Sequence, residues 1–441
     1  MTAQHETPPA LRAMTGESLR RRRVAVIGGG LVGNATACSA ARMGGDRVQV
    51  DLYEAATVGH EGGASIDVTR VFRHVYGEQA HYSRWNAEAV CRWRELERQS
   101  DRTLYRPTGG VWVAHASDRA ATSSGMERPF SPAEANRLLE VSLRTMRALG
   151  LPCEMLDGAE LRRRYPQFAD DSIAAALFDE EAGILHARDT VLALSEVGER
   201  HGVRRHDGMR AVEIAPSADS CGVRFADWSS IEADVVVVAA NGWTEALLPG
   251  LADRMVVRPS DDPLWHGSAL LWHQRGIQVT EQPLFYFAPP ASVGDEFSPG
   301  RFPVFLFVNA RVYGLPAHQG AVKAANNDPS RVLERPEARR LASQAYRDQL
   351  YGFLVGQFPG LRDAALMQER VCFYDRSPDE DFVMDQWDDQ SRVIVACGFS
   401  GHGFKFGPLL GARLAHYALS GQRPADLAPF SLSRFAPQTA G

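Results

Sequence analysis

The chain has 441 residues, of which 44% are hydrophobic and 23% are charged, and its formal net charge is −6 at pH 7. This composition indicates a globular protein of two or three domains. The negative balance argues against a general nucleic-acid binder, which is usually basic. No apolar stretch of the sequence approaches the roughly 18 residues that a membrane-spanning helix needs. We therefore expect neither nucleic acid nor membrane as a partner.

Cysteine and histidine usage favours reduced thiols and no metal site. The six cysteines form no CxxC pair, and the thirteen histidines form no HxH or HExxH pattern. Arginines at 20–23 precede an apolar run, as in a twin-arginine export signal, but that run ends at three glycines and is more typical of a first strand. Without a secretory leader, this usage predicts a cytoplasmic protein.

The first regular elements form a βαβ unit. Residues 1–20 lack periodicity and are predicted to be a flexible tail. RVAVIGG at 23–29 is predicted to be a buried strand, LVGNATACSAARMG at 31–44 a helix with small residues on one face, and RVQVDLYEA at 47–55 a second strand. Two later aliphatic runs, at 233–243 and 391–404, also have the pattern of a parallel strand that ends in a turn.

A dinucleotide fingerprint lies between the first strand and the helix. Gly28, Gly30 and Gly33 fit G-x-G-x-x-G, in which the glycines form the turn, let the backbone approach a pyrophosphate and allow close packing. Glu54 follows the last glycine by about 20 residues, where a carboxylate binds the ribose hydroxyls. The fingerprint predicts a dinucleotide site but does not by itself separate FAD from NAD.

The two lysines raise a separate question. Among 48 lysines and arginines, only Lys323 and Lys405 are lysine. A lysine is a compact point charge, whereas an arginine is a wide fork, so both positions could need a small cation beside a ligand; chance is the alternative. Lys405 lies in GFSGHGFKF (398–406). We predict that the glycines of this segment form the connection between a strand and a helix, and that Lys405 lies in the first turn of that helix. Because the helix dipole repels a cation there, we expect Lys405 to face an anion.

The turn and a second cationic segment both point to bound anions. Amide groups of the glycine-rich turn would suit the negative charge that develops on a reduced flavin. The segment TRVFRHVYGE (69–78) places Arg70 and Arg73 three residues apart, on one helical face or turn. Two cations so close indicate an anion between or beside them, and a pair of surface salt bridges is the alternative.

These segments resemble those of a known family. VIGGGLVG with Glu54, TRVFRHVYGE, VCFYDRSPDEDFVMD (371–385) and GFSGHGFKF resemble, in order and spacing, the monomeric sarcosine, N-methyltryptophan and pipecolate oxidases. These are N-substituted amino acid oxidases of the D-amino acid oxidase-like flavoproteins. The resemblance covers residues 23 to 430. It implies an FAD-dependent amino acid oxidase, most simply a monomer, that transfers hydride from Cα–H to flavin, releases an imine and reduces O2 to H2O2.

The resemblance also assigns roles. It implies that Arg73 and Lys405 clamp the carboxylate of an amino acid substrate, that Tyr374 lines the pocket and that Arg70 lies close to the flavin. YGLPAHQGAVK (313–323) resembles the family's strand pair, whose final lysine, here Lys323, activates oxygen.

Cys372 corresponds to the family's cysteine that bonds covalently to the flavin ring. The alternative is a buried structural thiol. Ala240 to Trp243 resemble the turn near the FAD phosphates. Two departures from the sarcosine oxidases, Asn327 in place of a histidine and Ser65-Ile66 in place of histidines, argue for a reshaped pocket. They favour a larger or differently shaped N-alkylated or cyclic amino acid from specialised metabolism.

The predicted fold is α/β. A Rossmann-type FAD-binding domain is expected from the discontinuous segments 21–110, 180–250 and 370–435, and a mixed-sheet α+β substrate domain from 111–179 and 251–369, because proline and aromatic residues become frequent between 250 and 370. The predicted catalytic residues are Lys323, Arg73, Lys405, Arg70, Tyr374 and Asn327. The predicted cofactor-binding residues are Gly28, Gly30, Leu31, Val32, Gly33, Glu54, Ala55, Ser65, Thr69, Arg70, Asn241, Gly242, Trp243, Cys372, Gly398, Gly401, His402, Gly403, Phe404 and Lys405.

Three other readings stay open at this point. A flavin dehydrogenase would pass electrons to a partner instead of oxygen, and Lys323 argues against it. An NAD-linked dehydrogenase leaves GFSGHGFKF and Cys372 unexplained. A non-catalytic FAD-binding protein would not need the cationic clamp of Arg73 and Lys405.

Overall fold

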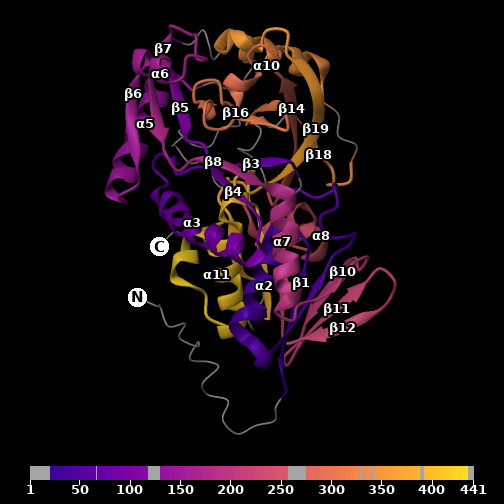
Figure 1. Ribbon diagram of the computed structural model, residues 1–441. Coiled ribbons are helices and arrows are strands. Elements are labelled where there is room, and N and C mark those ends of the chain that lie inside the picture. Colours follow the sequence, from indigo (N-terminus) through magenta and orange to yellow (C-terminus); the bar gives the residue numbers. More distant parts are fainter. Residues whose placement is uncertain are drawn as a thin grey trace.

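The computed structural model describes residues 20–65, 67–117, 130–256, 275–327, 331–338, 342–387 and 392–435. The predicted tail, apart from Arg20, and the predicted pocket position Ile66 lie outside these ranges. Two large sheets lie one above the other, with the short strands β3, β4 and β8 between them (Figure 1). Of the helices described, none is long and apolar enough to cross a membrane.

The lower sheet has six strands in the order β20–β21–β13–β1–β2–β9, all parallel except β20. Their bounds are β1 Arg22–Ile27, β2 Val48–Tyr53, β9 Arg204–His206, β13 Val235–Val238, β20 Val383–Gln386 and β21 Val393–Cys397. Their valine-rich runs are buried, as in parallel strands covered on both faces. All four strands predicted from the aliphatic runs are confirmed.

Alternate residues of these strands pack on opposite layers. Val24 and Val26 face the helices, whereas Ala25 and Ile27 face a three-stranded antiparallel sheet. The helices of the first layer are α2 Leu31–Gly44, α3 Ala80–Ser100, α7 Ala187–Arg200 and α11 Gly407–Ser420. The small sheet consists of β10 Ala211–Pro216, β11 Cys221–Phe225 and β12 Ser230–Ala233. The predicted helix at 31–44 is confirmed.

The upper sheet is mixed and has nine strands, in the order β18–β14–β17–β16–β15–β5–β7–β6, with β19 on the other edge of β14. Their bounds are β5 Gly110–His115, β6 Cys153–Asp157, β7 Ile173–Asp179, β14 Gln278–Ala288, β15 Val304–Phe307, β16 Val312–His318, β17 Ala321–Asn326, β18 Val332–Leu333 and β19 Ala365–Arg376. The mixed sheet predicted from the aromatic segments is confirmed. The core of this part is dominated by phenylalanine.

Helices cover the upper sheet, and further short helices follow β13. They are α5 Pro132–Ala148, α6 Gly158–Arg164 and α10 Gln344–Gln357, with α8 Thr244–Leu247 and α9 Leu251–Arg254 after β13.

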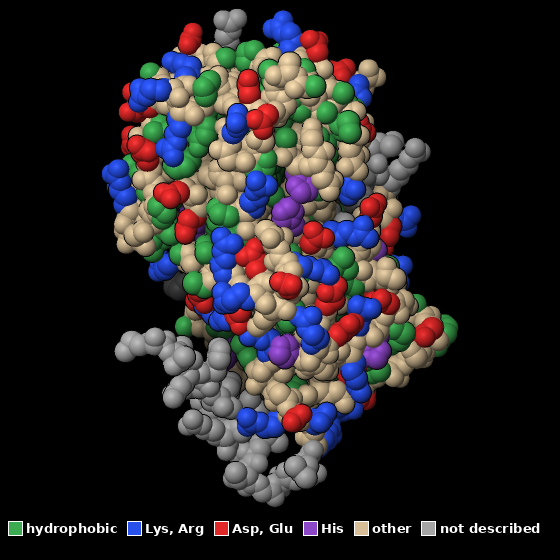
Figure 2. Space-filling view, viewed as in Figure 1, with side chains coloured by type: hydrophobic (Ala, Val, Ile, Leu, Met, Phe, Trp, Pro, Cys, Tyr) green, Lys and Arg blue, Asp and Glu red, His purple; other side chains and the backbone are tan. Residues whose placement is uncertain are grey.

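Positive and negative side chains are interspersed over the face seen in Figure 2. The predicted α/β fold class is thus confirmed. The division into domains stays a prediction, and its boundary at residue 370 falls inside β19.

The helical reading of the arginine segment was wrong. Residues Thr69–Phe72 form strand β3, which pairs antiparallel with β8 (Gly183–His186), and β8 also pairs with β4 (Tyr105–Pro107). Arg70 lies in this strand and Arg73 follows its last residue, so a spacing of three does not make them helical neighbours. What brings both arginines to one site is the position of β3 between the two large sheets.

A glycine sets the close contact between α2 and α11. A Cβ built at Gly411 would lie 2.4 Å from the Ala35 carbonyl carbon, whereas a Cβ at Gly356, in α10, would meet nothing within 4 Å. Gly411→Ala should therefore destabilise the protein by about 1–3 kcal/mol through overpacking. Gly356→Ala should leave stability unchanged or raise it by up to about 1 kcal/mol. Denaturant unfolding of both variants checks this, and equal effects would contradict the packing argument.

Candidate functional site

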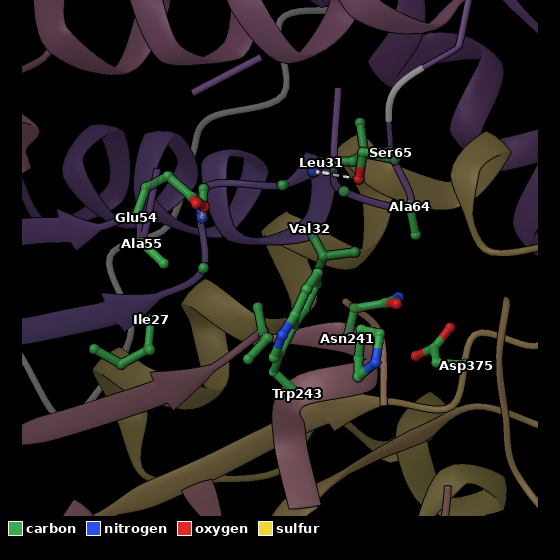
Figure 3. A pocket seen from close by; sticks show the side chains of 18 of the residues that line it. Ile27, Leu31, Val32, Glu54, Ala55, Ala64, Ser65, Asn241, Trp243 and Asp375 are labelled. Carbon is green, nitrogen blue, oxygen red and sulfur yellow. Dashed lines mark hydrogen bonds between the residues drawn. The ribbon is translucent and has the colours of Figure 1, made fainter. Parts of the chain in front are cut away.

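A long cavity of about 700 Å³ lies where β1, β2 and β13 end. In parallel α/β sheets, ligands bind in this crevice beyond the carboxyl ends of the strands. Ile27 to Val32 line it on one side, Glu54 and Ala55 near one end, and Asn241, Trp243 and Asp375 elsewhere along the wall (Figure 3). The cavity continues to Gly401, Gly403 and Phe404 of the predicted glycine-rich turn.

The fingerprint loop needs its first and third glycines. Gly28 has φ +110°, and a Cβ there would lie 2.4 Å from the Ala239 carbonyl oxygen of the neighbouring strand end. A Cβ at Gly33 would lie 1.8 Å from the Gly28 carbonyl oxygen. At Gly30 a Cβ would approach Ser65 Oγ at 3.1 Å. The loop is therefore a bare backbone cradle at the start of α2, which suits a pyrophosphate.

Glu54 lies at the end of β2 and is mostly buried. Its carboxylate accepts hydrogen bonds from the Gly29 amide at 2.7 Å and the Ala56 amide at 2.9 Å. A carboxylate has about four acceptor positions, so further positions remain beside these two bonds, and His60 Nε2 lies 3.5 Å from Oε1. Ser65 Oγ accepts a hydrogen bond from the Leu31 amide at 3.0 Å and so binds the first residue of α2 (Figure 3).

The remaining predicted cofactor residues differ in their position. Asn241 and Trp243 line the long cavity, whereas Gly242 packs against Val279 and Phe373. Thr69, Gly398 and Cys372 do not line it. The hydroxyl of Thr69 is buried and has no hydrogen-bond partner among the residues that the structure describes.

A smaller cavity adjoins the long one, and we call it the inner cavity. Both are lined by Arg70, Tyr374, Gly401 and Phe404. The inner cavity has a volume of about 140 Å³. Each of the six predicted catalytic residues lines it: Lys323, Arg73, Lys405, Arg70, Tyr374 and Asn327. The structure therefore brings together residues that are up to 335 positions apart, without testing the roles predicted for them.

Lys405 is buried beside a second cation. It lies in the 3₁₀ turn Phe404–Phe406, two residues before α11 begins at Gly407, and not in the first turn of the helix as predicted. Its ammonium donates to Tyr76 Oη at 2.9 Å and to the His402 carbonyl at 2.5 Å. Arg73 stacks on the same tyrosine, with its Cζ 4.2 Å from the ring centroid. Burial and the Arg73 charge hold the pKa of Lys405 well below its ordinary value.

Lys323 is buried too, but an acid binds it. Its ammonium donates to the carboxylate of Asp67 and, at 2.7 Å, to the Thr69 carbonyl. Burial lowers the pKa of Lys323 from its ordinary value, and the charge of Asp67 opposes that shift. Lys323 lies in β17, whose hairpin with β16 was predicted from the sequence and is confirmed. Of the two lysines, only Lys323 has a carboxylate within hydrogen-bonding distance among the residues described.

Arg70 links the acid to the predicted flavin cysteine. Its guanidinium donates to Asp67, to the Ala64 carbonyl at 3.1 Å and to Cys372 Sγ at 3.8 Å. Cys372 is buried in β19 and lines neither cavity. Tyr374, two residues along the same strand, lines both, and its hydroxyl lies 3.5 Å from that of Tyr313.

Sequence reasoning missed several residues of the site. They are Asp67, Tyr76, Tyr286, Tyr313 and Asp375. Asp375 lines the long cavity, and its carboxylate accepts from the Gly398 amide at 2.8 Å. Burial raises the pKa of Asp375 to about 7. Its signal was present, because it lies inside the quoted segment 371–385, and Tyr76 lies inside TRVFRHVYGE. Asp67 stands just before that segment and had no pattern of its own.

Within the described ranges, no group of three or more histidine, cysteine, aspartate or glutamate side chains is placed to hold an ion. The cavities instead combine a backbone cradle, a ribose-type acid and a set of cations. A fold and a site of this kind define a dinucleotide-dependent oxidoreductase.

Comparison with known proteins identifies the family. Residues 23–417 match the FAD dependent oxidoreductase family, DAO, and the chain belongs to it. N-methyl-L-tryptophan oxidase of Yersinia pestis (strain Pestoides F) is 28% identical over 416 residues, which cover 93% of this chain and 98% of that protein. The chain is therefore an FAD-dependent oxidoreductase related to amino acid oxidases, and the predicted family and cofactor are confirmed.

Solved structures agree on the fold. NikD, described as an unusual amino acid oxidase essential for nikkomycin biosynthesis, superimposes with a TM-score of 0.71 at 22% identity, over 95% of this chain and 98% of that one. L-proline dehydrogenase from P. horikoshii superimposes with a TM-score of 0.75 at 16% identity, over 94% and 98%. At these identities the likeness concerns the fold alone.

Proposed function

We propose that the protein is an oxidase of amino acids that carry a secondary or N-substituted amine, with O2 as the electron acceptor. The observation that carries the proposal is the pair of cations, Arg73 and Lys405, which both contact Tyr76 and line the inner cavity beside the long cavity. A buried ammonium beside a guanidinium is stabilised when an anion binds between them. A substrate carboxylate supplies that anion.

The long cavity would hold FAD. The cradle of Gly28 to Gly33 would hold the pyrophosphate, and Glu54 would bind the ribose hydroxyls. The part of the wall that contains Tyr374 and Phe404 would contact the ring system. The chemistry that FAD supplies when bound is two-electron oxidation: hydride leaves the Cα–H of the amine, an imine results, and O2 takes up the two electrons and protons to leave as H2O2.

The protein's own groups would position the substrate. Arg73 and Lys405 fix the carboxylate, which orients the Cα–H and the amine lone pair toward the shared wall of the two cavities, a proximity effect. Burial, and next the charge of Lys405, lower the pKa of His402 well below its ordinary value, so His402 is neutral and adds no competing charge.

The inner cavity also limits the substrate side chain. Part of its lining is apolar and includes Trp112, Leu138, Val304, Leu306 and Val308. Such a wall favours a substrate with a bulky apolar or cyclic side chain over one as small as sarcosine. This supports the substrate class expected from Asn327 and Ser65.

Removing the clamp should impair substrate oxidation. Under anaerobic conditions an N-methyl or cyclic amino acid should bleach the flavin absorbance, and the matching amine without a carboxylate should not. Lys405→Met should weaken substrate binding by roughly 10–100-fold, the loss of one charge-assisted contact. Arg301→Met removes an exposed cation that lines neither cavity and serves as the control. Equal bleaching by both compounds would refute the clamp.

The same clamp should respond to pH. The pKa of Lys405 is lowered, so the site keeps its ammonium below that pKa and loses it as the pH rises through it. A simple carboxylic acid without an amine should therefore bind the wild type most tightly below the pKa of Lys405, at pH values where the acid is still ionised. In Lys405→Met its affinity should be weak and nearly independent of pH. Titration of the flavin absorbance with the acid measures both.

Replacing the other lysine should impair a different half-reaction. Lys323→Met removes the cation proposed to stabilise negative charge on oxygen, so oxidation of the reduced enzyme by O2 should slow by roughly 100-fold. Reduction by substrate should change far less. Lys405→Met is the matched control, because it should show the opposite pattern. Stopped-flow measurements of each half-reaction decide, and equal effects of Lys323→Met on both would contradict its role. Peroxide formation separates an oxidase from a dehydrogenase.

We also propose that Cys372 carries the flavin covalently. Its thiol touches Arg70, which lines both cavities. Acid precipitation should leave the yellow colour on the protein. Cys372→Ser should release it into the supernatant, whereas Cys397→Ser, at another buried cysteine, should not. Free flavin released from the wild type would reject the covalent bond.

A further inference from the structure

The two lysines of the chain lie in opposite electrostatic surroundings. Lys405 is buried beside Arg73, and burial and that arginine account for its lowered pKa. Lys323 is bound by Asp67, whose side chain is fully buried. An acid buried at this point has a cost, because a carboxylate leaves water only when charges and hydrogen bonds replace its hydration. The contacts of Asp67 indicate what the acid is for.

Every contact of the Asp67 carboxylate stabilises its charged form. Oδ2 accepts from the Lys323 ammonium and the Arg70 guanidinium. Oδ1 accepts from Tyr286 Oη at 2.5 Å and from the Val68 amide at 2.8 Å. Burial favours the neutral acid, but the charges of Lys323 and Arg70 outweigh it and lower the pKa of Asp67. Asp67 is thus a fixed negative charge between two cations.

Lys323 needs this charge to remain an ammonium. The titratable and charged groups that face it are Asp67 from the loop before β3, Arg70 from β3, Cys372 from β19 and Tyr286 from β14. Among these four groups, Asp67 is the one carboxylate. Without it, a fully buried amine would stand beside a guanidinium, and both burial and repulsion favour loss of its proton.

The geometry also fixes where the ammonium lies. Two of its three N–H groups are used by Asp67 and by the Thr69 carbonyl. A lysine ammonium has three donors, so one is left for the inner cavity that Lys323 lines. Asp67 and Thr69 belong to one short segment, which enters β3 and holds the flexible lysine stem from one side.

We propose that Asp67 is a positioning residue for the oxygen half-reaction: it keeps Lys323 charged and directs its free N–H into the inner cavity. The proposal rests on the proposed function for its catalytic meaning. Its physical content, the charge state of Lys323, does not depend on any substrate. The segment that contains Asp67 is also where the sequence departs from the sarcosine oxidases, at Ser65 and Ile66.

The sequence makes a direct test possible, because the protein contains only two lysines. Lysine labelled with ¹³C at Cε and ¹⁵N at Nζ gives two side-chain signals in the FAD-loaded protein, and Lys405→Met assigns them. We expect the titration midpoint of Lys323 in Asp67→Asn to lie about 1–3 pH units below that of the wild type. Asp67→Glu should restore much of the wild-type midpoint. An unchanged midpoint in Asp67→Asn overturns the proposal.

Two further measurements keep the test decisive if Asp67→Asn does not fold. Wild-type Lys323 must give the signal of a charged ammonium at neutral pH, and a neutral amine there overturns the proposal. Tyr286→Phe removes a hydrogen bond from the same carboxylate without removing its charge, so the Lys323 midpoint should hardly move. A shift as large as that expected for Asp67→Asn would indicate that packing, not charge, governs the lysine.

The kinetic readout separates this proposal from the proposed function. The flavin can be reduced by light or dithionite, so its reaction with O2 is measured without any substrate. In Asp67→Asn this rate should fall as the pH rises through the lowered Lys323 midpoint, down to the level of Lys323→Met, while the wild type holds its rate to higher pH. The same pH dependence in both proteins overturns the proposal. Failure of every amino acid to reduce the flavin instead refutes the proposed function and leaves the lysine titration to decide the role of Asp67.

Discussion

The burial of positive charge between the two sheets is the constraint on which this site depends. Lys323 and Lys405 are almost completely buried, with Arg70 and Arg73 beside them. Removing an ammonium from water costs several kcal/mol unless a partner compensates it. Glu380 also lines the inner cavity, but Arg376 binds its carboxylate. Among the described residues, Asp67 is therefore the acid that forms an ion pair with a lysine, and that lysine is Lys323.

The fold creates this concentration of charge from distant segments. Strand β3 carries Arg70 and leads to Arg73 between the sheets, the hairpin β16–β17 brings Lys323 from the upper sheet, and the turn before α11 brings Lys405 from the lower one. Arg70 and Lys323 leave paired strands, and Lys405 leaves a 3₁₀ turn. On the proposed function, a substrate carboxylate enters between Arg73 and Lys405 and offsets their repulsion.

Local pattern was sufficient for the βαβ unit and insufficient for the site. The strand β1, the helix α2 and the glycines between them follow from residues that are close in sequence, and all were predicted. The segment of Arg70 was read as helical because a spacing of three suits a helix. Its actual conformation is set by pairing with β8, more than 100 residues away, which no local pattern encodes.

The same limit explains the missed acid. Lys323 and Asp67 are 256 residues apart, and Tyr286 and Asp67 are 219 apart. Nothing near Asp67 in the sequence marks it as a partner of a lysine. The lysines themselves were found by their rarity and by the resemblance of their segments to a known family, and both signals belong to single positions. A contact between two positions needs the fold.

The difference between the two lysines suits a reaction in two halves. Lys405 lacks a carboxylate partner among the described residues and would gain one only with a substrate acid, so its charge state changes with occupancy. Lys323 has its acid in the protein, so its charge state is set before either reactant arrives. On the proposed function the first reactant is an anion that brings its own counter-charge, whereas dioxygen is neutral and brings none. A cation that serves dioxygen must therefore be stabilised by the protein, and Asp67 is placed where that stabilisation is required.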